Sequence, residues 1–233
     1  MQPNHFKRGM RVVQFYSKSK ERNDLPGVGD DWRKTLSNFY PSKITIDGAT
    51  YPTCEHAFHA AKCRSSDNYS AYKEFTVNGK VGMRPEEAKK AGGRKGFEAL
   101  GAKLDKVKWE RIKSKENMKI LQARWGQHPE FQAILRALYP RIRDDNWYLL
   151  HFERSGKKSE WGGSYSETEG VKGQNLLGRQ LMALVRNKLD NTACQQADRP
   201  DKKRKSEKEA ESCQLLDKQP SIKRIKQSVI SNQ

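Results

Sequence analysis

The sequence predicts an α+β fold in which helices predominate and strands are few and short. Apolar residues recur at helical spacing between positions 105 and 138 and again after residue 175. Residues 43–51 and 147–152 are instead rich in the branched and aromatic residues that strands favour. A hydrophobic content of 34% is enough to build the core of one folded domain.

The first elements expected along the chain are strands. Residues 8–16 contain a short β-rich run, and the polar segment that follows is typical of a loop. Ile44 and Ile46 then alternate with polar residues ahead of Asp47-Gly48, a dipeptide typical of tight hairpin turns. We therefore expect a small hairpin over residues 43–51.

The segment after this hairpin is expected to be a closely packed helix with a polar face. Thr53 follows a proline and can cap the first turn through its hydroxyl group. At 100° per residue, Glu55, His59 and Lys62 lie within roughly 60° of one another, while most other positions up to residue 63 are small or apolar. Three ionisable groups are thus directed to one place.

Later elements follow from apolar periodicity and from glycine and proline positions. The expected elements are helices over 68–75, 86–91, 105–125 and 131–138, a strand over 147–152, a glycine-rich surface loop over 161–175 and a last helix capped by Asn175. Gly126 to Pro129 should interrupt the long helix, and Pro140 should end the next one. Gly178, inside the last helix, predicts close approach of a neighbour or ligand.

The chain is strongly basic, with a formal charge of +18 and a pI near 9.8. Residues 1–190 hold 36 Lys and Arg against 22 Asp and Glu, so the C-terminal region does not explain the basicity. The charge fits an anionic partner, such as DNA, RNA, a dinucleotide or a phosphorylated metabolite. A merely solubilising surface is the alternative.

The composition changes at residue 190 to few apolar residues, which predicts a basic, disordered tail (190–233) after the folded part. Two basic clusters in the tail, Lys202-Lys-Arg-Lys205 and Lys223-Arg-Ile-Lys226, are similar to a bipartite nuclear-import signal. No apolar run has membrane-spanning length, and the N-terminus lacks a signal-peptide core. We expect an intracellular protein without a membrane partner, with the nucleus favoured over the cytoplasm.

Common cofactor and metal motifs are missing from the sequence. A P-loop, G-x-G-x-x-G after a strand, G-x-S-x-G and H-E-x-x-H are all absent, and the four cysteines have neither zinc spacing nor a disulfide pattern. We therefore expect no cofactor and no metal, and chemistry from a less familiar site.

Four segments, in this order, resemble the motifs of the NADAR (YbiA-like) domain family. The resemblance extends from Val12 to Leu189, so it implies a domain over residues 12–189 that follows an N-terminal extension (1–11). It also implies that this domain is compact, mostly helical and α+β, with a small antiparallel sheet. The segments are Leu36-Ser-Asn-Phe-Tyr40, Tyr51-Pro-Thr-Cys-Glu-His-Ala-Phe-His-Ala-Ala-Lys62, Trp161-Gly162 and Gly173-Gln-Asn-Leu-Leu-Gly-Arg-Gln-Leu-Met-Ala-Leu-Val-Arg186.

The resemblance also implies action on N-glycosidic bonds of ribose-phosphate compounds. Activities associated with the family are removal of ADP-ribose from guanine and hydrolysis of phosphorylated riboflavin-pathway intermediates. It implies that Glu55 and Lys62 belong to the active site. The residues implied to line the substrate pocket are Asn38, Phe39, Trp161 and Asn175, with His59 beside the catalytic pair.

Two positions depart from the family pattern. His59 stands where the family usually has glutamine, which alters the hydrogen bonds beside Glu55 and Lys62. Lys158 stands three residues before Trp161, where an acidic residue is common. An acid role from this loop would then fall to Glu153 or Glu160.

Cleavage of an N-glycosidic bond builds positive charge on the ribose C1 carbon, which a carboxylate such as Glu55 can stabilise. A neutral Lys62 amine could attack C1 and form an imine that water resolves. Each of these residues also has a purely structural interpretation. Glu55 and Lys62 could only stabilise a helix, and His59 could be a packed residue. Asn38 could be a turn residue, and Trp161 could be a core aromatic. Two arginines of the last helix could bind a diphosphate or simply favour that helix, namely Arg179 and Arg186.

The leading hypothesis is an N-glycosidase that removes ADP-ribose from guanine in nucleic acid or nucleotides, with DNA or RNA bound by the basic surface. One alternative is an N-glycosidase for phosphorylated riboflavin-pathway intermediates. Another is a non-catalytic module that binds ADP-ribose or NAD. The sequence does not indicate the oligomeric state.

Overall fold

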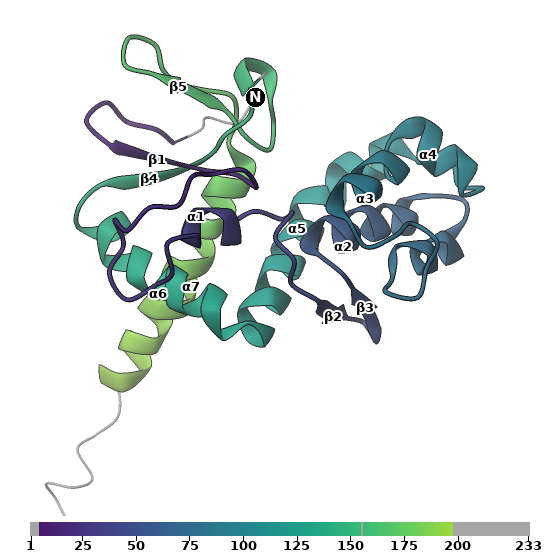
Figure 1. The fold of residues 1–233 in the computed structure, drawn as a ribbon, viewed down its shortest axis with the longest axis horizontal. Coiled ribbons are helices and arrows are strands. Elements are labelled where there is room, and N and C mark those ends of the chain that lie inside the picture. The colour runs from purple at the N-terminus through teal and green to yellow at the C-terminus, as the bar shows by residue number, and fades with distance from the viewer. Residues whose placement is uncertain (1–4, 155, 198–233) are drawn as a thin grey trace, which may run out of the picture. The chain divides into compact units, whose positions relative to one another are not determined.

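The computed structural model describes residues 5–154 and 156–197 (Figure 1). The chain forms a compact unit, Met1–Leu189, and a second unit, Asp190–Gln233. The helices and strands are β1 (Arg11–Phe15), α1 (Trp32–Thr35), β2 (Ile44–Ile46), β3 (Ala49–Tyr51), α2 (Cys54–Ala61), α3 (Pro85–Ala91), α4 (Arg94–Ala99), α5 (Lys106–Gln127), α6 (Pro129–Arg143), β4 (Trp147–His151), β5 (Ser164–Ser166), β6 (Gly170–Lys172) and α7 (Leu176–Ala197). Short 3₁₀ helices are η1 (Lys62–Ser65), η2 (Tyr69–Phe75) and η3 (Gly156–Lys158).

Among the described residues, the strands form three pairs rather than one sheet. β1 runs parallel to β4, with Val13 opposite Leu149, and these two strands lie side by side in Figure 1. β2 and β3 form the expected antiparallel hairpin, since Asp47 and Gly48 adopt φ angles of 52° and 78°. β5 and β6 form a second antiparallel hairpin.

Two hydrophobic clusters make up the core of Met1–Leu189, and α5 contributes to both. The first joins β1, β4, α1, α6 and α7, and includes Leu121 of α5. The second joins α2, α3 and α4 to the β2–β3 hairpin, and includes Ile120 of α5. Neighbouring residues of one helix point in directions about 100° apart, so α5 links the two clusters.

Several elements differ from the sequence prediction. The interruption expected over 126–129 is present at His128, but α5 continues through Gly126 to Gln127, because the helical cost of glycine, about 1 kcal/mol, is small beside the burial of Trp125. Pro140 lies inside α6 rather than at its end, since Ile142 beyond it is buried in the core. Residues 161–175 are not all loop, because buried Val171 pairs with Tyr165 in the β5–β6 hairpin.

Other differences from the sequence prediction concern the short helices and the C-terminal region. The segment predicted as a helix over 68–75 is the 3₁₀ helix η2, and neither α1 nor α4 was predicted. α7 reaches Ala197, so residues 190–197 are helical rather than part of a disordered tail. The rest of the predicted tail, including both basic clusters, lies outside the described residues. Within the described ranges, every helix is too short or too polar to cross a membrane.

Gly178 lets α7 pack closely on β4. A Cβ atom added at this position would lie 2.2 Å from the Leu149 carbonyl oxygen, far inside van der Waals contact. Gly126 in α5 offers the opposite case, because an added Cβ would meet nothing within 4 Å. The close approach predicted at Gly178 is therefore to the backbone of a neighbouring strand.

The two glycines predict opposite effects of the same substitution. Gly126→Ala should raise the free energy of unfolding by up to about 1 kcal/mol, because alanine is the better helix former. Gly178→Ala should lower it by about 1–3 kcal/mol, because overpacking displaces α7 from β4. Urea unfolding of both variants measures the difference, and equal effects at the two positions would contradict the packing described here.

Candidate active site

A pocket of about 400 Å³ lies beside α2 and is lined by elements of both hydrophobic clusters. Glu55, Phe58 and His59 come from α2, and Lys62 comes from the turn that follows it. The other lining residues are Tyr16, Ser17, Ser37, Asn38, Phe39, Lys89, Asn117, His151, Phe152, Glu153, Trp161 and Leu177. All four segments of the NADAR-like pattern thus contribute to one cavity, the last of them through Leu177.

Helix α2 begins at the cap predicted from the sequence. The His56 backbone N–H donates to the Thr53 hydroxyl oxygen at 3.3 Å. The backbone N–H of Glu55, one residue earlier, donates to the Asn38 carbonyl oxygen at 3.0 Å. This second bond ties the start of α2 to the Ser-Asn-Phe segment, which brings two motifs into one wall.

Glu55 and His59 form a hydrogen-bonded pair on the pocket side of α2. Their Oε1 and Nε2 atoms are 3.0 Å apart, and their side chains are only 12% and 7% exposed. Burial lowers the pKa of His59, while the bond to Glu55 opposes that shift. A Cβ atom on Gly92 would lie 2.0 Å from the His59 Nδ1 atom, so the ring is also tightly packed. The His59 ring is therefore both hydrogen-bonded to the Glu55 carboxylate and closely packed.

Lys62 is held at the same pocket with its amine largely removed from water. Its Nζ atom donates to the Gly92 carbonyl oxygen at 2.7 Å. Burial lowers the pKa of Lys62 to about 8, although the negative charge of Glu55 acts in the opposite direction. About one Lys62 in ten is then a neutral amine at pH 7, against fewer than one in a thousand for an exposed lysine.

The Ser-Asn-Phe segment is fixed by buried polar side chains from α5. Arg124 Nη1 donates to the Ser37 carbonyl oxygen at 3.1 Å, and Asn38 Nδ2 donates to Asn117 Oδ1 at 3.2 Å. Among the described residues, Asn38 Oδ1 is buried without a hydrogen-bond partner. It lines the pocket, so it offers a free acceptor for a ligand N–H or O–H group.

Aromatic rings form the apolar part of the pocket. Trp161 and Phe58 pack edge to face with ring centroids 4.9 Å apart. The Lys89 ammonium group lies 5.6 Å from the centre of the Phe39 ring. Trp161 and Phe39 therefore line the pocket beside Glu55, His59 and Lys62. Lys89 lines it as well, although the sequence analysis did not select this residue.

Asn175 does not line the pocket. Its Nδ2 atom donates to the Leu149 carbonyl oxygen at 2.7 Å, and its Oδ1 atom accepts from the His151 amide at 3.0 Å. The side chain is fully buried. In this structure Asn175 therefore fixes β4 to the start of α7 rather than reaching the cavity with the other predicted residues.

The two acidic candidates of the Trp-Gly loop differ in position. Glu153 lines the pocket, with its Oε1 atom 3.7 Å from His151 Nδ1, whereas Glu160 forms an ion pair with Lys113. Burial lowers the pKa of His151, and the charge of Glu153 opposes this shift. Glu153 is the acidic group of this region that the cavity can use, while the side chain of Lys158 is exposed.

Sequence reasoning missed Lys89, Asn117 and His151. Each lies in an element that was predicted correctly, but no spacing rule distinguishes it from its neighbours. Within the described parts of the chain, no group of three or more His, Cys, Asp or Glu side chains could hold a metal ion.

Comparison with known proteins agrees with the resemblance of the motifs. The profile of the NADAR domain matches residues 20–190. The chain belongs to the NADAR family. Its relatives in this family include N-glycosidase YbiA of Escherichia coli (strain K12), 29% identical over 174 residues, and N-glycosidase YbiA of Shigella boydii serotype 4 (strain Sb227), 28% identical over 173 residues. Each alignment covers 74% of this chain and 86% of the relative.

The NADAR assignment is matched by the fold. The NMR structure of E. coli YbiA superposes with a TM-score of 0.54 at 24% identity, over 86% of this chain and 99% of that structure. The α+β prediction is therefore confirmed. At this identity, the superposition supports the fold alone.

The coupling of Glu55 to Lys62 predicts how the lysine titrates. Glu55 stabilises the ammonium form, so Glu55→Gln should lower the pKa of Lys62 below about 8 and raise the neutral fraction at neutral pH. The measurement is NMR titration of the Lys62 ¹³Cε resonance in both proteins. Glu86→Gln, at an exposed position on α3, is the control and should leave the titration unchanged. A higher Lys62 pKa in Glu55→Gln would contradict this electrostatic account.

Proposed function

We propose that this NADAR protein hydrolyses the N-glycosidic bond between ribose C1 and a base nitrogen, and that it removes ADP-ribose from guanine in nucleic acid or nucleotides. The observation that supports the reaction is the buried Lys62 amine, with a pKa of about 8, in one pocket with Glu55. The relatives' name, N-glycosidase, agrees with it. The guanine substrate rests on the resemblance to the family.

In the proposed reaction, the neutral Lys62 amine bonds to C1 while the C1–N bond breaks, and the bonding electrons leave with the base. The departing nitrogen takes a proton, for which Glu153 and His151, which also line the pocket, are the candidates. The lysine nitrogen then loses a proton and forms a double bond to C1, while the ring oxygen leaves C1 with the bonding electrons and takes a proton, which gives an open-chain imine. Water then adds to C1, frees the sugar and restores the amine.

The other pocket residues suit the remaining parts of such a substrate. Glu55 stabilises positive charge at C1 and can accept a proton from the attacking water, with its carboxylate oriented by His59. The Lys89 ammonium group is available to a phosphate. The Asn38 carboxamide oxygen and the Trp161 ring offer a hydrogen-bond acceptor and an apolar surface for base and sugar.

Substitution of Lys62 tests the proposed nucleophile. Lys62→Ala should lower the rate of ADP-ribose release from an ADP-ribosylated guanine substrate by about 10²-fold or more, because the chemical step loses its nucleophile. Lys90→Ala, at an exposed position outside the pocket, should keep the wild-type rate. Full activity of Lys62→Ala would overturn the proposal.

Borohydride reduction tests the imine itself. Reduction during turnover should leave a stable sugar adduct on Lys62, detected by peptide mass spectrometry, and none in Lys62→Ala. An active preparation without an adduct would instead favour direct attack by water activated by Glu55.

A substrate panel tests the choice of base. Free base and free sugar are followed with ADP-ribosylated guanine, phosphorylated riboflavin-pathway intermediates and NAD. Release from guanine alone supports the proposal, and release from the riboflavin-pathway compounds alone would assign the alternative N-glycosidase. Binding of ADP-ribose without release of any base would identify a non-catalytic module.

A further inference from the structure

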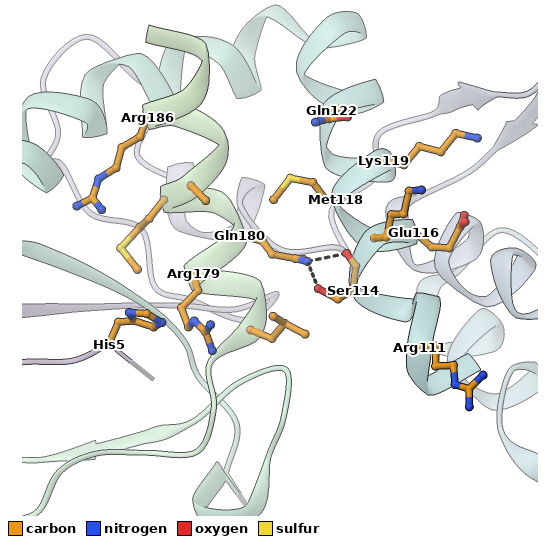
Figure 2. Close-up of a pocket in the computed structure, with 14 residues that line it drawn as sticks. His5, Arg111, Ser114, Glu116, Met118, Lys119, Gln122, Arg179, Gln180 and Arg186 are labelled. Carbon is orange, nitrogen blue, oxygen red and sulfur yellow. Dashed lines mark hydrogen bonds between the residues drawn. The ribbon is translucent and has the colours of Figure 1, made fainter. Parts of the chain in front are cut away.

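A second and larger cavity, of about 940 Å³, lies between α5 and α7 and shares no lining residue with the candidate active site. Figure 2 shows the two helices on either side of it, with Gln180 of α7 directed toward Ser114 of α5. We name it the α5–α7 groove. Its lining residues from these helices are Arg111, Ser114, Lys115, Glu116, Met118, Lys119, Gln122, Leu176, Arg179, Gln180, Met182, Ala183 and Arg186.

The rim of the α5–α7 groove is strongly cationic. Five lysines and arginines line it against one acidic residue, Glu116. Glu116 lies 3.7 Å from Arg64, and Lys119 pairs with Asp47. Within the described residues, no carboxylate lies within 4 Å of the four remaining cations, which are Arg111, Lys115, Arg179 and Arg186. Unpaired cations of this number favour an anionic occupant.

The cations are spread along the helices rather than gathered at one point. From Arg111 to Lys119 α5 rises about 12 Å, and from Arg179 to Arg186 α7 rises about 10 Å. In Figure 2 the guanidinium groups of Arg111 and Arg186 are directed away from the middle of the groove. A single phosphate would need several donors at one place, whereas an extended polyanion can contact each cation in turn.

Besides its cations, the groove is lined by apolar residues and by His5, with no Phe, Tyr or Trp among its described lining residues. Met118 and Met182 lie there together with Leu176 and Ala183. Stacking of bases on aromatic rings, the usual source of base contact in single-strand binding, is therefore limited to the imidazole ring of His5. Contacts to the phosphate backbone would dominate, and binding would depend little on base sequence.

Buried amides connect the groove to the candidate active site. Asn117 lines the pocket and donates through Nδ2 to Gln180 Oε1 at 2.5 Å. Gln180 lines the groove and donates in turn to the Ser114 carbonyl oxygen at 2.7 Å. The two cavities thus lie on either side of one hydrogen-bonded contact between α5 and α7.

We infer that the α5–α7 groove binds nucleic acid through its phosphodiester backbone, on a face separate from the pocket that contains Lys62. This adds a binding face for a polymer to the proposed function, and its test requires no catalysis. The occupant is identified by charge complementarity, by the length of the cationic rim and by the absence of Phe, Tyr and Trp among its described lining residues.

The test is fluorescence anisotropy with the full chain and an unmodified, fluorescein-labelled DNA strand of about 20 nucleotides, longer than most single-strand sites. The groove variant is Arg111→Gln/Arg179→Gln/Arg186→Gln. Its affinity should fall about tenfold or more at 0.1 M salt, and the slope of log K against log salt should become shallower by about 2, for three lost phosphate contacts.

The control variant is Lys90→Gln/Lys95→Gln/Lys103→Gln, which removes three exposed charges outside the groove. It should keep the wild-type slope. Three outcomes would each overturn the inference. The groove variant could have the same salt slope as wild type, both variants could lose the same DNA affinity, or the wild-type chain could fail to bind the DNA. Thermal unfolding of both variants verifies that they fold.

Hydrolysis of an ADP-ribosylated guanine mononucleotide, measured on the same variants, separates this inference from the proposed function. The groove variant should hydrolyse it at the wild-type rate, because the three arginines do not line the pocket. DNA binding through the groove without base release would contradict only the proposed function. Base release with equal DNA binding by all three proteins would contradict only the groove.

Discussion

The burial of three ionisable side chains beside α2 is the constraint on which the candidate site depends. Removing Glu55, His59 and Lys62 from water is costly unless each finds a partner. Glu55 and His59 bond to each other, and Lys62 bonds to the carbonyl of Gly92. The lowered pKa of Lys62 is the direct result of this burial. A shallower site would leave the lysine charged, as on any exposed helix.

A network of buried amides then holds the walls of the pocket in place. Asn38 bonds to Asn117, which bonds to Gln180, while Arg124 holds the Ser37 carbonyl. Fully buried polar groups of this kind are costly to leave unpaired, so they allow few alternative arrangements of α5, α7 and the Ser-Asn-Phe segment. The same helices carry the cationic groove on their other side. One helix contact therefore supports a compact pocket and an extended surface.

Features that depend on residues within a few positions of one another could be predicted from the sequence. The cap at Thr53, the hairpin turn at Asp47 and the face that Glu55 and His59 of α2 share with Lys62 just after it all follow from helix and turn geometry. The close approach at Gly178 was predicted as well, although its partner, the Leu149 carbonyl, could not be named. The family pattern added that several of these segments meet.

Features that depend on distant residues were decided only by tertiary structure. Lys89, Asn117 and His151 reach the pocket from three elements that are far apart in the chain. Asn175 instead forms a hydrogen bond to the backbone of β4. Pro140 lies inside α6 because the helix continues to Ile142, which is buried in the core. Sequence by itself determined the local geometry of α2 and its ionisable face, because caps and periodicity are short-range. Packing decided which groups surround that face and how far they lie from water, because burial is a property of the whole fold.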